Sequence, residues 1–239
     1  MPSILEDPNT TTPLPASHIT SLKSNTVPLT APYKATLKSG LPVTLYPITT
    51  GLSSLPASLV EFLHQEFSAE IIRGCTYPME EPMEYERFGD YWFGGFGVVA
   101  VLGASDSIPA LGERDWANEC LGTFYIKPNY PGRCSHVCNG GFLTTGAARG
   151  QGVGMAMGRA YLHFAPLLGY KSSVFNLVFE NNVASVKIWD RLGFSVLGRV
   201  PGAARLANSE ELVDALIIGK DLVRKEEEEK KEVVVEATA

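Results

Sequence analysis

One glycine-rich segment constrains the fold of this chain more than any other part of its sequence. A mostly apolar run ends near Thr145, and Arg149-Gly-Gln-Gly-Val-Gly154 then leads into a stretch rich in alanine and methionine. Glycine lets the backbone turn tightly and lets a ligand approach it closely. The first N–H groups of a helix have no partners within the helix and lie at the positive end of its dipole. The segment therefore predicts a strand, a turn and a helix that together bind a pyrophosphate.

Three phosphate-binding motifs compete for this segment, and one of them fits its spacing. A Walker A loop ends in Gly-Lys-Ser/Thr, which is absent here. A Rossmann fingerprint requires a third glycine or alanine, at a position occupied here by Met155 or Met157. The remaining R-x-x-G-x-G spacing of Arg149, Gly152 and Gly154 resembles the acetyl-coenzyme A loop of the GNAT superfamily of N-acetyltransferases. A helix start whose glycines serve only packing is the alternative interpretation.

A second segment lies downstream in the order that this family requires. The run Asn182-Val-Ala-Ser-Val-Lys-Ile-Trp-Asp-Arg-Leu-Gly-Phe194 resembles the GNAT segment after the fifth strand, in which an asparagine precedes a helix that ends in Leu-Gly-Phe. The resemblance implies that Asn182 and this helix contact the pantetheine arm of acetyl-CoA. Many GNAT enzymes have a general-acid tyrosine where this chain has Trp189, whose indole is a poor acid. The cofactor-binding residues implied are Phe142, Leu143, Thr144, Arg149, Gly150, Gly152, Val153, Gly154, Asn182 and Trp189.

Residues 120–222 also resemble the fungal enzymes that acetylate proline analogues such as azetidine-2-carboxylate. The resemblance is carried by CSHVCNGGFL from Cys134, by SVFNLVF from Ser173 and by VDA from Val213. In those enzymes the asparagines that match Asn139 and Asn176 hold the substrate's carboxylate and ring nitrogen near the thioester. The resemblance implies that this pair is catalytic.

The residues around these two asparagines leave a structural role open. Asn176 lies in an otherwise apolar strand, and a buried amide requires hydrogen-bond partners, which neighbouring backbone groups could supply. Asn139 precedes Gly140-Gly141, where a β-bulge would turn its side chain toward a cleft. A simple turn is the alternative for Asn139.

The expected mechanism is direct attack of an amine on the thioester in a ternary complex, without an acyl-enzyme. Its main contribution is the correct positioning of the two reactants. A backbone N–H near Phe142 or Leu143 would polarise the thioester carbonyl. Because an asparagine does not titrate, water relayed through Asn139 or Asn176 is the expected base. The side chains ranked below water are His136 and Glu180.

Composition excludes several other classes of protein. A net charge of −6, with no dense basic cluster, argues against nucleic-acid binding. No apolar run reaches the roughly 20 residues of a membrane span, and the N-terminus lacks a secretory signal. Cys134, His136 and Cys138 would supply three zinc ligands without the second half of a structural site, so no metal is expected. The four cysteines are expected to be free thiols in a cytoplasmic protein, with a nuclear or mitochondrial pool left open.

The pattern along the chain predicts an extended arm at residues 1–38, a GNAT domain at 39–223 and a charged tail at 224–239. The predicted strands are 43–47, 91–102, 119–127, 139–145, 173–179, 195–200 and 212–219, and the predicted helices are 55–72, 152–168 and 183–192. Such mixing indicates an α/β (α+β) domain with a central sheet flanked by helices. The resemblance implies a mixed, mostly antiparallel sheet with a V-shaped splay between two parallel central strands.

Three functions are compatible with these features. The first is acetyl-CoA-dependent acetylation of a small cyclic secondary amino acid of the azetidine-2-carboxylate or hydroxyproline type, with detoxification as its consequence. The second is acetylation of protein lysines or polyamines through the same cofactor site. The third is a non-catalytic acyl-CoA sensor. Because the family often dimerises, a homodimer is expected.

Overall fold

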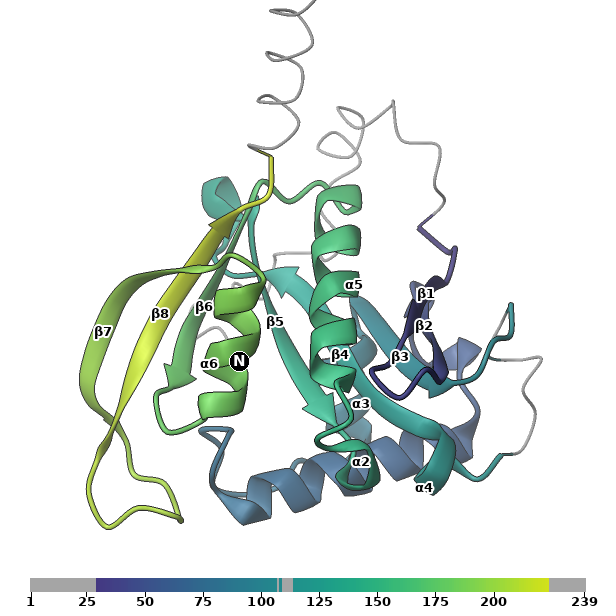
Figure 1. Cartoon of the computed structure of the whole chain (residues 1–239), viewed down its shortest axis with the longest axis horizontal. Coiled ribbons are helices and arrows are strands. Elements are labelled where there is room, and N and C mark those ends of the chain that lie inside the picture. The colour runs from purple at the N-terminus through teal and green to yellow at the C-terminus, as the bar shows by residue number, and fades with distance from the viewer. Residues whose placement is uncertain (1–28, 107, 109–113, 224–239) are drawn as a thin grey trace, which may run out of the picture.

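The computed structural model describes residues 29–106, 108 and 114–223. Within them, one eight-stranded sheet has the order β1-β2-β3-β4-β5-β6-β8-β7 (Figure 1). The strands are β1 (Tyr33–Thr36), β2 (Pro42–Ile48), β3 (Phe96–Leu102), β4 (Cys120–Pro128), β5 (Val137–Thr144), β6 (Ser172–Phe179), β7 (Ser195–Ala204) and β8 (Val213–Asp221). The α-helices are α2 (Ala57–Arg73), α3 (Tyr85–Phe93), α4 (Trp116–Glu119), α5 (Val153–Leu167) and α6 (Val183–Arg191). Short 3-10 helices are η2 (Gly51–Ser54), η4 (Gly132–Cys134) and η5 (Gly146–Ala148).

The sheet is divided by a splay between its two parallel strands. All other neighbouring strands are antiparallel, whereas β5 and β6 run parallel. Their register includes only Val137 opposite Ser172 and Cys138 opposite Ser173, after which the strands diverge (Figure 1). The predicted mixed, mostly antiparallel GNAT fold with a V-shaped splay is confirmed.

A buried tyrosine of α5 holds the apex of the splay together. The Tyr161 Oη lies 3.1 Å from the Cys138 Sγ and 2.6 Å from the Ser173 Oγ, and all three residues are buried. Burial raises the pKa of the Cys138 thiol to about 12, so this thiol stays protonated. One hydroxyl therefore bridges the two strands at the point where they still pair.

Aromatic side chains fill the widening gap on one side of the sheet. The Trp189 ring of α6 packs between Phe142 of β5 and Phe175 of β6, at centroid distances of 4.8 and 4.6 Å. Dispersion and apolar burial at these rings stabilise the divergence of the strands, which would otherwise leave a void.

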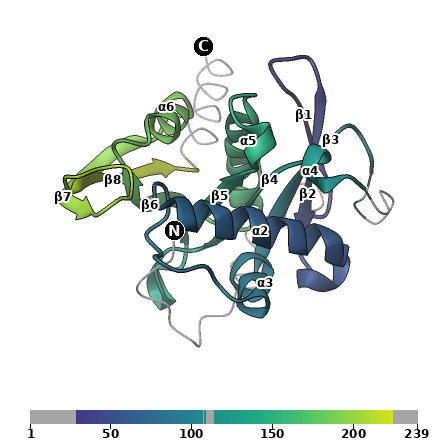
Figure 2. The same ribbon diagram turned by 90° about the horizontal axis from the view of Figure 1, so that it is seen from below.

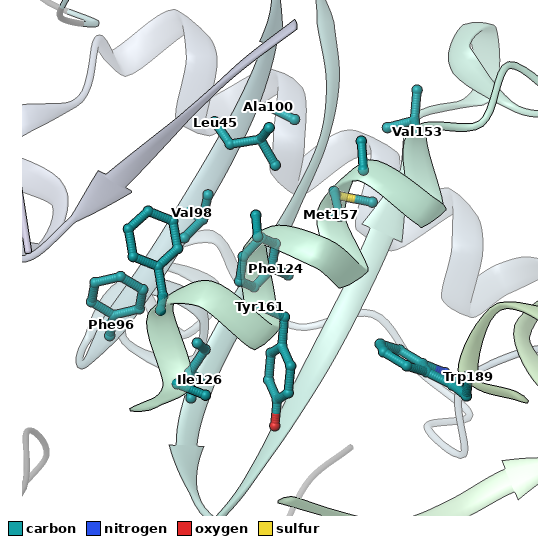
Figure 3. Close-up of a cluster of buried hydrophobic side chains, with 14 of the residues drawn as sticks. Leu45, Phe96, Val98, Ala100, Phe124, Ile126, Val153, Met157, Tyr161 and Trp189 are labelled. Atoms are coloured by element: carbon teal, nitrogen blue, oxygen red, sulfur yellow. The ribbon is translucent and has the colours of Figure 1, made fainter. Parts of the chain in front are cut away.

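The helices cover both faces of the sheet. Helices α5 and α6 lie on one face, and α2 and α3 lie on the other (Figure 2). Val153, Met157 and Tyr161 of α5 belong to a core with Phe124 and Ile126 of β4 (Figure 3). None of the helices in the described part of the chain combines the length and hydropathy needed to cross a bilayer.

Two departures from the predicted elements change the architecture. Residues 85–93 form helix α3, whereas the strand predicted at 91–102 begins only at Phe96. Phe88 and Trp92, four residues apart, bury one helical face, and the Trp92 Nε1 donates to the Thr123 Oγ1 at 2.8 Å. Tertiary packing thus overrides the strand preference of the aromatic residues.

The second departure concerns the predicted arm. Strand β1 lies within the range 1–38 and pairs with β2, so the folded domain includes residues from at least Tyr33. Residues 1–28 of the arm and the predicted tail at 224–239 lie outside the described residues.

Candidate active site

The glycines of the loop between β5 and α5 serve two different purposes. Gly150 and Gly152 have φ angles of +77° and +88°, which other residues rarely adopt. Gly154 lies inside α5, where an added Cβ would come within 2.9 Å of the Ile188 Cδ1 on α6. The first two glycines shape the turn, and the third allows close packing of α6 against the start of α5.

At the N-terminus of α5, the first backbone N–H groups precede the hydrogen bonds of the helix, and the stem of a lysine lies close by. The N–H of Ala156 donates to the Gly152 carbonyl at 3.2 Å, so the N–H groups of Val153 and Gly154 precede the first bond of the helix. The Lys38 Cγ lies 3.6 Å from the position that a Cβ on Gly152 would occupy. This combination of helix dipole, amide donors and a nearby lysine suits a phosphate group.

Two glutamates of α2 hold the same loop in place. The Glu66 Oε2 accepts from the Gly146 N–H at 2.6 Å, and the Glu70 Oε2 lies 2.7 Å from the Arg149 Nη2. Glu70 is buried and also bonds Arg73 and Thr76. The structure thus directs the Arg149 guanidinium to α2, where its charge is compensated.

The backbone of β5 directs alternate peptide groups into the splay. The Asn129 N–H donates to the Val137 carbonyl at 2.7 Å, and the Thr145 N–H donates to the Leu121 carbonyl at 3.1 Å. Because antiparallel bonding alternates, Leu143 bonds to β4, whereas Phe142 points its N–H and C=O toward β6. The Phe142 carbonyl accepts from the Tyr77 Oη at 2.9 Å.

This alternation distinguishes between the two predicted amide donors. The Phe142 N–H faces the gap between the parallel strands, as does the N–H of Thr144, two residues further along β5. Leu143 instead has a buried side chain on the α2 face of the sheet. Phe142 is therefore the better placed of the two to polarise a carbonyl in the splay.

Three asparagines meet on the α2 face near the apex of the splay. Asn129 follows β4, Asn139 lies on β5, and Asn176 lies on β6. The Asn139 Nδ2 donates to the Asn129 Oδ1 at 2.7 Å. Asn129 and Asn176 exchange two bonds, from Asn129 Nδ2 to Asn176 Oδ1 at 3.0 Å and from Asn176 Nδ2 to Asn129 Oδ1 at 2.5 Å. The two asparagines expected to be catalytic are thus joined through a third that the sequence reasoning missed.

One acceptor atom in this cluster has no partner among the described residues. Asn139 has no exposed surface, and its Oδ1 is buried without a hydrogen bond. A buried carbonyl oxygen of this kind costs about 1–3 kcal/mol when it is left unpaired. An N–H donor from a ligand would remove that cost.

The β-bulge expected at Asn139 lies elsewhere. The register from Gly122 opposite Thr144 to Pro128 opposite Cys138 is continuous, so that prediction is wrong. The register shift instead falls between Phe175 and Val178 on β6, around Asn176.

Gly140 and Gly141 have a packing role that explains why they do not mark a bulge. A Cβ on Gly140 would come within 2.8 Å of the Tyr161 ring, and a Cβ on Gly141 would come within 2.5 Å of the Tyr125 ring. The glycine pair therefore accommodates a tyrosine on each face of the sheet.

A lysine and two tyrosines lie next to the asparagine cluster. Lys127 is opposite Asn139 in the register of β4 and β5. Its Nζ lies 4.6 Å from the Tyr91 ring centroid and 4.9 Å from that of Tyr125. The two tyrosine hydroxyl oxygens are 3.1 Å apart. This group was not predicted from the sequence, although Tyr125 and Lys127 alternate on β4 and Asn129 follows two residues later.

The remaining predicted cofactor residues lie on α6. The Asn182 Oδ1 caps this helix by accepting from the Ser185 N–H at 3.2 Å. Trp189 is buried among aromatic rings, and its Nε1 donates to the Ser185 Oγ at 3.1 Å. The indole N–H is thus engaged within the helix, and the ring packs against the gap between the strands.

The side chains considered as bases lie at the edges of this region. His136 is exposed on the turn before β5, and the Glu180 carboxylate forms an ion pair with Arg199. Cys134 is exposed, whereas Cys138 is buried against Tyr161. No group of three or more potential metal ligands gathers anywhere in the described ranges.

Comparison with known proteins identifies the family. Residues 67–194 match the family model described as the acetyltransferase (GNAT) family. The chain is 47% identical over 152 residues to N-acetyltransferase aca1 of Schizosaccharomyces pombe, an alignment that covers 62% of this chain and 73% of that protein.

Solved structures agree with this match. A GCN5-related N-acetyltransferase from Kribbella flavida superposes with a TM-score of 0.60 at 26% identity, covering 74% of this chain and 97% of that one. A phosphinothricin acetyltransferase from Sinorhizobium meliloti, solved in complex with AcCoA, shares the fold with a TM-score of 0.56 at 14% identity, covering 75% of this chain and 88% of that one. Together with the splayed sheet and the loop before α5, these matches show that the chain belongs to the GNAT family of N-acetyltransferases.

Proposed function

We propose that this protein transfers the acetyl group of acetyl-CoA to the nitrogen of a small cyclic secondary amino acid, of the azetidine-2-carboxylate or hydroxyproline type. The observation that carries the proposal is the asparagine cluster, in which the buried Asn139 Oδ1 lacks a partner among the described residues. An amine N–H is the complementary group for this oxygen.

The loop before α5 fits the pyrophosphate of acetyl-CoA. The free N–H groups at the helix start and the adjacent Lys38 would hold its charge, while Glu66 and Glu70 keep the loop in place. The β5 peptide groups that point into the splay would bond the pantetheine arm, and the Phe142 N–H would polarise the thioester carbonyl. The phosphinothricin acetyltransferase of the same fold was solved in complex with AcCoA, which supports acetyl-CoA as the co-substrate.

The asparagine cluster suits an acceptor that approaches from the α2 face. Asn139 Oδ1 would accept the N–H of the amine and orient its lone pair toward the thioester carbon. Acetyl-CoA supplies the acetyl group as a thioester. The acceptor nitrogen forms the new C–N bond, the C–S bond breaks, and the amine proton passes to water. The leaving thiolate needs little help because an ordinary thiol has a pKa of about 8.5.

Free-thiol release from acetyl-CoA tests this proposal. The acceptors are azetidine-2-carboxylate, cis-4-hydroxyproline, spermidine and a lysine peptide, each assayed with the wild type, with Asn139→Ala and with Asn176→Ala. Asn181→Ala, a change at an exposed asparagine, is the matched control. We expect release with the cyclic amino acids, lost in the two cluster variants and retained in the control.

Other outcomes would overturn the proposal. Release with spermidine or the lysine peptide alone would assign the protein to the polyamine or protein acetyltransferases. Acetyl-CoA binding without release for any acceptor would support a sensor.

A further inference from the structure

Lys127 lies on the same face of the sheet as the unpaired asparagine oxygen. Lys127 and Asn139 are directly opposite in the antiparallel register of β4 and β5. Side chains at such positions share a face, with Cβ atoms about 4.5–5.5 Å apart. Asn129, two residues after Lys127, lies on that face as well and bonds Asn139. A cation and an unpaired acceptor are therefore neighbours near the apex of the splay.

Aromatic packing fixes the position of this cation. The Lys127 Nζ lies over the rings of Tyr91 and Tyr125, whose faces attract a positive charge. Tyr125 packs on Gly141, and Tyr91 stacks on Phe67 with centroids 6.2 Å apart. Because Gly141 and Phe67 hold the two rings in place, the Lys127 side chain has already lost much of its conformational freedom before any ligand binds.

The chemistry of the two groups matches the two ends of an α-amino acid. Asn139 Oδ1 takes an N–H donor, and an ammonium with three N–H donors takes a carboxylate. In a cyclic α-amino acid the nitrogen and the carboxylate are attached to the same carbon, so both groups reach one compact ligand. A polyamine would place a second cation against Lys127, which disfavours it.

We infer that Lys127, held above Tyr91 and Tyr125, binds the acceptor's carboxylate and makes this enzyme selective for anionic acceptors over polyamines. The inference rests on the proposed function, since it assigns the second contact of the same acceptor.

Azetidine-2-carboxamide separates charge recognition from folding. This probe keeps the ring and the amine and replaces the carboxylate by a neutral amide. For wild type we expect kcat/KM to be about 10- to 100-fold higher for azetidine-2-carboxylate than for the carboxamide, the range expected for one bond to a charged group. Lys127→Met should reduce this ratio to about one to three, with the KM for acetyl-CoA unchanged.

Two further variants complete the test. Lys127→Arg keeps the charge and should restore most of the ratio. Lys127→Gln also removes the charge, and it replaces Lys127→Met should that variant fail to fold. Lys34→Met, at an exposed lysine of β1, is the matched control and should keep the wild-type ratio.

The outcomes separate this inference from the proposed function. A wild-type enzyme that prefers the carboxylate, combined with a Lys127→Met variant that keeps the same preference, would overturn the role of Lys127 alone. A wild-type enzyme that acetylates neither cyclic compound would overturn the proposed function. Equal rates for both compounds in wild type would show that the carboxylate is not recognised.

Discussion

Replacing Tyr161 by phenylalanine tests whether one hydroxyl holds the apex of the splay. The change keeps the ring and removes the oxygen that lies 3.1 Å from the Cys138 Sγ and 2.6 Å from the Ser173 Oγ. A hydrogen bond contributes about 0.5–1.5 kcal/mol, and a buried hydroxyl left unpaired costs about 1–3 kcal/mol. Because Ser173 is fully buried, we expect the free energy of unfolding to fall by about 1.5–3 kcal/mol.

Urea unfolding measured by tryptophan fluorescence and by circular dichroism gives this free energy. With a typical m-value of about 1–3 kcal/mol/M, the midpoint should fall by roughly 0.5–3 M while m stays constant. The double variant Tyr161→Phe/Ser173→Ala isolates the hydrogen bond between these two residues, because it leaves no Ser173 hydroxyl unpaired. Tyr33→Phe on β1 is the matched control.

Either of two results would refute the role of this hydroxyl. One is a loss of less than about 0.5 kcal/mol in Tyr161→Phe, which is within the range of a surface substitution. The other is strict additivity of the Tyr161 and Ser173 changes, because residues that share a buried bond should be coupled.

Three further predictions concern the site and the stability of the fold. Trp189→Phe should retain most turnover, because its indole N–H bonds the Ser185 Oγ and its ring packs the core; a collapse of kcat in a folded variant would reveal a chemical role. Glu70→Ala should raise the KM for acetyl-CoA by about 10-fold or more with a smaller change in kcat, because Arg149 and the loop lose a buried ion-pair partner. Glu70→Gln should recover part of the lost affinity. An unchanged KM in initial-rate measurements would contradict the anchoring role of Glu70. The Cys120 and Cys138 thiols have pKa values raised by burial from 9.0 to about 12, so they ionise first in the unfolded chain. The free energy of unfolding should therefore be full below pH 9.0 and fall by up to about 1.4 kcal/mol per pH unit for each thiol between pH 9.0 and about 12. A urea midpoint that stays flat from about pH 8 to 11 under reducing conditions would argue against this pH dependence.

Local chemistry made much of the framework predictable. Positive φ angles at Gly150 and Gly152 depend on the residue itself, so the turn before α5 could be predicted from a short segment. The apolar period of α2 is likewise a local pattern. The parallel splay could not be derived from such patterns and came from the resemblance to the family.

Local patterns failed where packing decided the outcome. The aromatic residues of α3 favour a strand by propensity, but the buried face of Phe88 and Trp92 requires a helix. Gly140-Gly141 suggested a bulge, whereas both glycines make room for tyrosines of other elements, and the register shift fell at Asn176.

The sequence by itself determined the family and the glycine-rich turn before α5, and it singled out Asn139 and Asn176 as candidates, because each depends on residues that are close together in the chain. Only the tertiary structure decided which partners those residues have. Asn129 meets Asn176 across 47 positions, and Arg149 meets Glu70 across 79. Such meetings depend on strand register and on helix placement, which the whole core sets cooperatively, and no short segment encodes them.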